Sequence, residues 1–134
     1  MNILEIIEKK REKDSEYQSF YLETKASLEQ LEKQRMEVSH WNKKEKISIV
    51  TPLYHTPAIF LRELIESVLE SSYENWQLCF ADATQDGDEN QIENIVKEYQ
   101  KMDEKLTGKK SRICYKKLSQ NYGIAENTNQ ALAM

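Results

Sequence analysis

Apolar side chains along residues 46–134 form short continuous runs that alternate with stretches of helical periodicity. The runs at residues 46–51, 76–81 and 112–115 are rich in β-branched and aromatic residues and predict strands. The apolar stripes that follow the first two runs consist of Phe60, Leu61, Leu64, Ile65, Val68 and Leu69, and of Ile92, Ile95, Val96 and Tyr99. A third helix is expected to begin near Ile124. Alternating strands and helices, with strands apolar on both faces, indicate an α/β fold with a Rossmann-like parallel sheet.

Turn and cap residues set the expected element boundaries. Pro52 should stop the first strand, and Thr56 should cap a helix that has Pro57 at its first position. Asp88 with Gln91 has the pattern of a cap for the second helix. A turn at residues 121–123 should precede the third helix.

Residues 1–45 have a different composition and are predicted to form an N-terminal helical arm. They contain 9 Lys or Arg, 10 Asp or Glu, and no Gly or Pro. Ser27 with Gln30 forms a capping-box pattern, so a first helix should end near Lys25 and a second should follow. The first helix carries an aromatic stripe of Tyr17, Phe20 and Tyr21. Two interpretations stay open: an arm that binds a partner or a second copy, and an extension that lies on its own domain.

Charge and composition exclude several classes of protein. The net charge of −4 argues against a protein that binds nucleic acid through phosphate contacts. The sequence has no long apolar run and no secretory leader pattern, so we expect a cytoplasmic location, either free or at the inner face of a membrane. Cys79 and Cys114 are 35 positions apart without a CxxC pair, which predicts buried free thiols rather than a zinc site or a disulfide framework.

Ligands of parallel α/β sheets bind at the carboxyl ends of the strands, so the loops at residues 52–56, 82–88 and 118–123 are the candidates. Tyr54 offers a ring for stacking a flat ligand, next to a backbone fixed by Pro52. Asp82 can accept hydrogen bonds from an imide or a ribose hydroxyl. Each of these two interpretations has an alternative of similar weight. The first loop can be a turn into a helix that needs no ligand, and Asp82 can instead cap the turn that follows it.

Other motifs are weaker or missing. The second loop has acidic residues spaced like calcium ligands: Asp82, Asp86, Asp88 and Glu93, with Gly87 and Asn90 between them. Because this loop follows a strand rather than a helix, we interpret the acidic residues as charges that favour the start of the next helix. The fingerprints of dinucleotide-binding, P-loop, zincin and hydrolase sites do not occur. Gly123 should adopt a positive φ or admit a close approach, and Asn127 and Asn129 should face the same strand-end crevice.

Four segments in order, at residues 46–57, 60–74, 75–82 and 121–132, resemble the start of family 2 glycosyltransferases of the GT-A fold. The resemblance implies that residues 46–134 are the N-terminal half of such a domain. It also implies a site for a nucleotide-diphosphate sugar, with Thr51, Pro52 and Tyr54 against the base and ribose. Asp82 would meet the uracil or ribose edge, and Asn129 would help to line the pocket.

The chain departs from the family pattern in ways that bear on activity. His55 replaces the usual Asn, and Ala83 stands where many members have a second acidic residue or Asn. The metal-binding DxD motif and the catalytic base of the family are expected beyond Met134. A divalent cation, Mn or Mg, is therefore expected only for a full-length enzyme and not for this chain, which should be inactive on its own because nothing offsets the diphosphate charge.

The sequence thus predicts the nucleotide-sugar-binding portion of a glycosyltransferase that acts on a glycan acceptor. The alternative is a non-catalytic interaction or scaffold module that uses its helical arm. An exposed sheet edge, or the arm itself, is expected to support a homo-oligomer.

Overall fold

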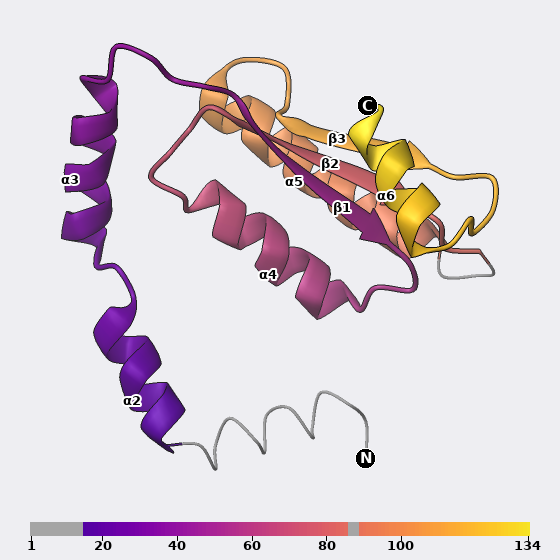
Figure 1. The fold of residues 1–134 in the computed structure, drawn as a ribbon, viewed down its shortest axis with the longest axis horizontal. Helices are drawn as coiled ribbons and strands as arrows, with labels where there is room; N and C mark the ends of the chain where they lie inside the picture. Colours follow the sequence, from indigo (N-terminus) through magenta and orange to yellow (C-terminus); the bar gives the residue numbers. More distant parts are fainter. Residues whose placement is uncertain (1–14, 86–88) are drawn as a thin grey trace.

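A computed structural model describes residues 15–85 and 89–134 (Figure 1). The arm contains α2 (Ser15–Thr24) and α3 (Leu28–Ser39). The α/β part then follows in the order β1 (Ile47–Leu53), α4 (Ala58–Leu69), β2 (Trp76–Asp82), α5 (Glu89–Thr107), β3 (Ile113–Lys117) and α6 (Ile124–Leu132).

The three strands form one parallel sheet in the order β1-β2-β3. Their last residues are in register, since Leu53 pairs with Asp82 and Asp82 pairs with Lys117. All three carboxyl ends therefore meet level at one edge of the sheet. This arrangement confirms the predicted α/β class with a Rossmann-like parallel sheet.

Helices cover the two faces of the sheet unequally. On one face, α4 and α5 pack together over the strands in a core made of Leu53, Leu61, Ile65, Val68, Trp76, Leu78, Phe80, Ile92, Ile95, Val96, Tyr99 and Ile113. On the other face, α6 covers a small cluster of Ala81, Ala83, Leu118 and Ala131, against which Val50 packs. The predicted stripe of the second helix is entirely buried in the first core. Burial of these apolar side chains is the main term that stabilises the fold.

The predicted end of β1 and the predicted N-cap of α4 are wrong. β1 continues through Pro52 to Leu53, because β1 is an edge strand, where a residue without an N–H is tolerated. Thr56 does not cap α4; the N-cap is Pro57, with no hydrogen bond from its side chain. The predicted cap at Asp88 lies outside the described residues.

Within residues 15–45 the arm contains two helices, as its cap residues predict. Ser27 and Gln30 make both hydrogen bonds of the capping box, and α2 ends three residues before it, at Thr24. α3 contacts the α/β part through polar groups: Gln34 accepts a hydrogen bond from Ser72, and Arg35 donates to the Glu70 carbonyl.

Phe20 and Tyr21 of α2 keep much of their surface exposed to solvent. Phe20 is 61% exposed and Tyr21 is 45% exposed. Figure 1 shows α3 near the amino ends of the strands and α2 apart from the sheet. This placement favours the interpretation of an arm over that of an extension packed on its own domain. Among the described residues, no helix has the length and apolar character needed to cross a membrane.

Candidate functional site

The first two predicted site loops lie side by side at the carboxyl edge of the sheet. The Ala83 N–H donates to the Leu53 carbonyl over 2.9 Å, which extends the β1–β2 ladder by one residue. Tyr54 follows Leu53 directly and is 53% exposed. Tyr54 and Asp82 therefore occupy adjacent strand ends, as the sequence analysis expected.

The backbone after Tyr54 is held in an unusual conformation. His55 has φ 46°, which is in the left-handed region where residues with a Cβ are strained. The Thr84 hydroxyl accepts a hydrogen bond of 2.9 Å from the His55 N–H. The His55 ring packs edge-on against the Tyr54 ring, with 4.5 Å between centroids. These contacts fix where the exposed Tyr54 ring stands.

Asp82 is fully buried and joins the three strand ends. Its Oδ1 accepts a hydrogen bond of 2.9 Å from the Thr84 N–H, and its Oδ2 accepts one of 2.6 Å from the Tyr115 hydroxyl. The Lys117 ammonium is 3.6 Å from Oδ2 and also donates to the Thr84 carbonyl. Both carboxylate oxygens thus point at protein partners. In this structure Asp82 organises the edge and presents no surface to a ligand.

Thr84, Tyr115 and Lys117 belong to this network, and the sequence analysis did not identify them. The third strand was predicted to end at Tyr115, whereas β3 continues to Lys117. Two consecutive lysines interrupt the apolar pattern after Tyr115, so the pattern predicts a strand end two residues too early. The rule that ligands meet the carboxyl ends of strands would have selected Lys117 if the strand end had been placed correctly.

The third candidate loop is organised by Asn127. This buried side chain accepts from the Tyr122 N–H over 3.1 Å and donates to Asn121 over 2.8 Å. Gly123 has φ 90°, and a Cβ there would meet nothing within 4 Å, so the backbone angle rather than close approach requires glycine. Asn127 therefore shapes its own loop.

The remaining predicted site residues lie in different surroundings. Thr51 and Pro52 are half-buried within β1, next to Phe80 and Ala81 of β2. Asn129 is exposed on α6, and its amide lies 3.5 Å from Glu126. The structure brings Thr51, Pro52, Tyr54 and Asp82 together on two adjacent strand ends, and it places Asn129 on a separate helix.

The described residues do not fit a metal site. Among residues 15–85 and 89–134, no group of three or more His, Cys, Asp or Glu side chains gathers in a way that could hold an ion. Asp82, the nearest carboxylate to the candidate site, already has its oxygens engaged. The sequence does contain one D-x-D spacing, Asp86-Gly87-Asp88, in the calcium-like run. These three residues lie outside the described part of the chain, and we derive no step through a cation.

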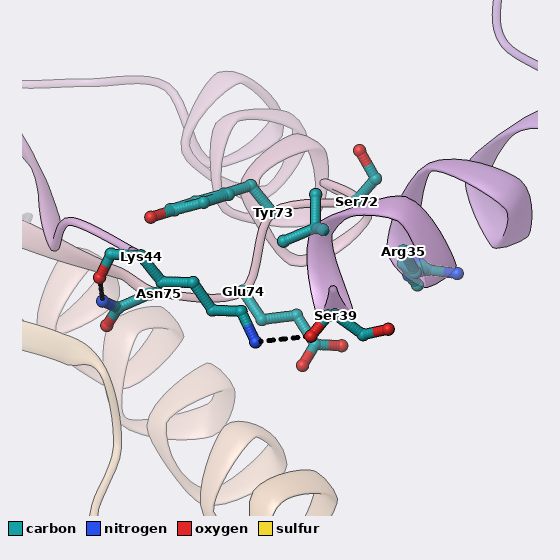
Figure 2. A pocket seen from close by; sticks show the side chains of 8 residues that line it. Arg35, Ser39, Lys44, Ser72, Tyr73, Glu74 and Asn75 are labelled. Atoms are coloured by element: carbon teal, nitrogen blue, oxygen red, sulfur yellow. Dashed lines mark hydrogen bonds between the residues drawn. The ribbon is translucent and has the colours of Figure 1, made fainter. Parts of the chain in front are cut away.

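Two cavities lie at the opposite, amino edge of the sheet, where the arm joins. One, of about 310 Å³, is lined by residues of α3 and of the segment before β2, and Figure 2 shows Lys44 donating to the Ser39 carbonyl across it. A second, of about 550 Å³, shares Arg35, Glu74 and Asn75 with the first and continues to Arg112. The arm thus meets the α/β part at the end of the sheet remote from Tyr54 and Asp82.

Comparison with known proteins identifies the class to which this fold and edge belong. Residues 48–134 match the family described as Glycosyl transferase family 2. The match covers well over half of the chain, so the chain belongs to this family. It begins one residue after the start of β1 and includes the whole sheet and the candidate edge.

A similar segment occurs in a much longer protein. The chain is 53% identical over 36 residues to a Sinorhizobium fredii protein described as "Uncharacterized protein y4gI". That segment is 27% of this chain, and the chain spans only about 4% of the length of this curated relative. No solved structure matches the chain.

Proposed function

We propose that this chain is the nucleotide-sugar-binding portion of a glycosyltransferase that transfers a sugar from a nucleotide-diphosphate donor to a glycan acceptor. The observation that carries the proposal is the exposed Tyr54 ring, which stands at the carboxyl ends of parallel strands beside Asp82. Membership of Glycosyl transferase family 2 supports it.

Each residue of the edge has a physical part in this proposal. The Tyr54 face would stack against the base, while Thr51 and Pro52 shape the strand beneath it. Asp82 would act mainly by holding Thr84 and Tyr115 in place, since its oxygens are already engaged. Lys117 would bring a positive charge toward the diphosphate. Asn129 would approach from α6.

Transfer itself would require groups that we place outside the described residues. In a complete enzyme an acceptor hydroxyl would displace the nucleoside diphosphate directly, and a divalent cation would offset the charge of the leaving group. We therefore expect this chain to bind a donor nucleotide without transferring the sugar. We also place the chain in the cytoplasm, free or at the inner face of the membrane.

Calorimetric titration with UDP and dTDP tests the proposal. We expect saturable heat from at least one nucleotide, with the affinity weakened about 5- to 160-fold by Tyr54→Ala, because stacking of a base on an aromatic ring is worth roughly 1–3 kcal/mol. Tyr21→Ala, on the arm, is the matched control, since Tyr21 is exposed to a similar degree and should leave binding unchanged. No heat at millimolar nucleotide would contradict the proposal.

A second function, a non-catalytic interaction or scaffold module, is favoured by one observation. Apolar side chains of the arm are exposed to solvent, with Phe20 61%, Leu22 71% and Leu28 80% exposed. On this reading the arm would hold a partner protein or a second copy, and the chain would bind no nucleotide. Light scattering during the same titrations separates the two. The second function predicts self-association that disappears in Phe20→Ser/Leu22→Ser and no heat from nucleotide, whereas the first predicts heat from nucleotide that this variant leaves unchanged.

A further inference from the structure

The two cysteines of the chain lie directly opposite each other in the sheet. Cys79 of β2 is the register partner of Cys114 of β3. Side chains alternate between the faces of a strand, and the neighbours of Cys79, Leu78 and Phe80, belong to the core under α4 and α5. Both thiols therefore project from the face on which α6 packs.

The spacing of paired strands suits a bond between the two sulfurs. Neighbouring strands lie about 4.8 Å apart, which falls within the roughly 4.4–6.8 Å between Cα atoms that a disulfide allows. Both thiols are free in this structure. Burial raises the pKa of the Cys79 thiol, and the adjacent Cys114 thiol raises it further. The two sulfurs are thus in mutual contact range.

The two thiols differ in access to solvent. Cys79 is 2% exposed, whereas Cys114 is only partly buried. On this face α6 packs mainly against β1 and β2, whereas Cys114 lies on β3. A small reagent in solution can therefore reach Cys114 first and Cys79 only through it.

We propose that Cys79 and Cys114 form a redox-modified dithiol, which closes to an intrachain disulfide by exchange with a small-molecule disulfide such as oxidised glutathione. In the first step the Cys114 thiolate attacks one glutathione sulfur, and the S–S bond breaks to release one glutathione thiolate. In the second step the Cys79 thiolate attacks the Cys114 sulfur and expels the second glutathione. The chain loses two protons and two electrons, and one oxidised glutathione becomes two reduced ones.

The location of this bond links it to the carboxyl edge. Cys79 is three residues before Asp82 on β2, and Cys114 directly precedes Tyr115, whose hydroxyl binds Asp82. A bond between the two cysteines would join β2 and β3 covalently on the face of the sheet opposite to that hydrogen bond. The inference concerns the sheet alone and does not depend on the proposed function.

Intact-mass analysis and peptide mapping of the folded chain in glutathione buffers test the proposal. In oxidised buffer we expect a chain lighter by two hydrogen atoms, with one disulfide between Cys79 and Cys114, and full reversal in reduced buffer. A folded chain that keeps glutathione on Cys114 while Cys79 stays free would overturn the proposal, as would a chain that does not react.

Two single variants show the order of the steps. Cys79→Ala should stop at stable glutathione on Cys114, because no second thiol can displace it. Cys114→Ala should remain unmodified while folded, because Cys79 is buried. Glutathione on Cys79 in folded Cys114→Ala would contradict the assigned order, and circular dichroism shows whether each variant is folded. The mapped wild-type disulfide decides the main claim even if a variant fails to fold.

Discussion

Asp82 and Asp103 are both fully buried carboxylates, yet they lie at opposite edges of the sheet and have different partners. Asp103, near the end of α5, accepts hydrogen bonds from the Arg112 guanidinium, the nearest at 2.6 Å, and from the Arg112 N–H at 2.8 Å. Asp82 has a phenol hydroxyl at 2.6 Å, and its cation, Lys117, is 3.6 Å away.

The difference separates a structural ion pair from a candidate functional edge. Arg112 also stacks on Trp76, at 3.9 Å from the ring centroid, and donates to the Glu74 carbonyl, so every part of that amino-edge cluster has a partner. At the carboxyl edge, an exposed aromatic ring and a half-buried lysine adjoin the carboxylate. Burial of a carboxylate is therefore no marker of function by itself. Its partners and its neighbours distinguish the two cases.

The largest effect should come from Asp103→Ala. Removal of this carboxylate leaves the Arg112 guanidinium and N–H without their acceptor, which costs about 3–5 kcal/mol for a buried pair. Urea unfolding of the variant and the wild type measures this difference in unfolding free energy. A loss below about 1 kcal/mol would show that the pair is weakly coupled to folding.

The Asp103–Arg112 pair should also make the stability of the fold depend on pH. Burial opposes ionisation of Asp103, but the hydrogen bonds and charge of Arg112 outweigh burial and hold its pKa below the ordinary value of 3.8. A lowered pKa in the folded state contributes stability that is present above pH 3.8 and is lost as pH falls through the folded value. The difference in unfolding free energy between the wild type and Asp103→Ala should therefore be constant near neutral pH and become smaller in acid. A difference that stays constant down to acid unfolding would contradict this assignment.

A smaller loss of stability is expected from Asp82→Ala, about 2 kcal/mol. The change removes the carboxylate that accepts hydrogen bonds from the Thr84 N–H and the Tyr115 hydroxyl, but the Lys117 ammonium is not in hydrogen-bonding contact with Asp82. The same variant should weaken nucleotide binding by roughly 1–3 kcal/mol, because the edge loses its organising carboxylate. If the variant is folded and binds as the wild type does, Asp82 has no part in the site.

The smallest of the three effects should be that of Tyr115→Phe. This change removes one hydroxyl donor to Asp82 and keeps the ring packed against the main core, so a cost of about 1 kcal/mol is expected. Tyr99→Phe is the control at a distance from the edge, since the Tyr99 hydroxyl donates to Glu66 between α4 and α5. Both should unfold with similar losses, but only Tyr115→Phe should affect nucleotide binding.

The sequence predicts the fold well because the relevant signals are local. Strands buried on both faces appear as apolar runs, and Ser27 with Gln30 marks the start of α3. Ile92, Ile95, Val96 and Tyr99 follow helical spacing and are all buried. The effect of Pro52 could not be predicted in the same way, because it depends on whether its strand lies at an edge, which is a property of the sheet and not of the segment.

The candidate site is predicted only in part, because its contacts come from distant positions. Tyr54 and Asp82 follow from the rule about strand ends, but two of the three partners of Asp82, Tyr115 and Lys117, are 33 and 35 positions further along the chain. The pairing of Cys79 with Cys114 likewise depends on the register of β2 against β3. No periodicity within either segment specifies that register.

The attachment of α3 has a consequence for how the chain can be used. The arm meets the α/β part around Arg35, Ser72 and Glu74, behind the amino ends of the strands (Figure 2). A tether or a label placed on α3 would therefore lie at the edge of the sheet remote from Tyr54 and leave the carboxyl edge open to small molecules. The arm is thus the natural handle for immobilising this protein in binding assays.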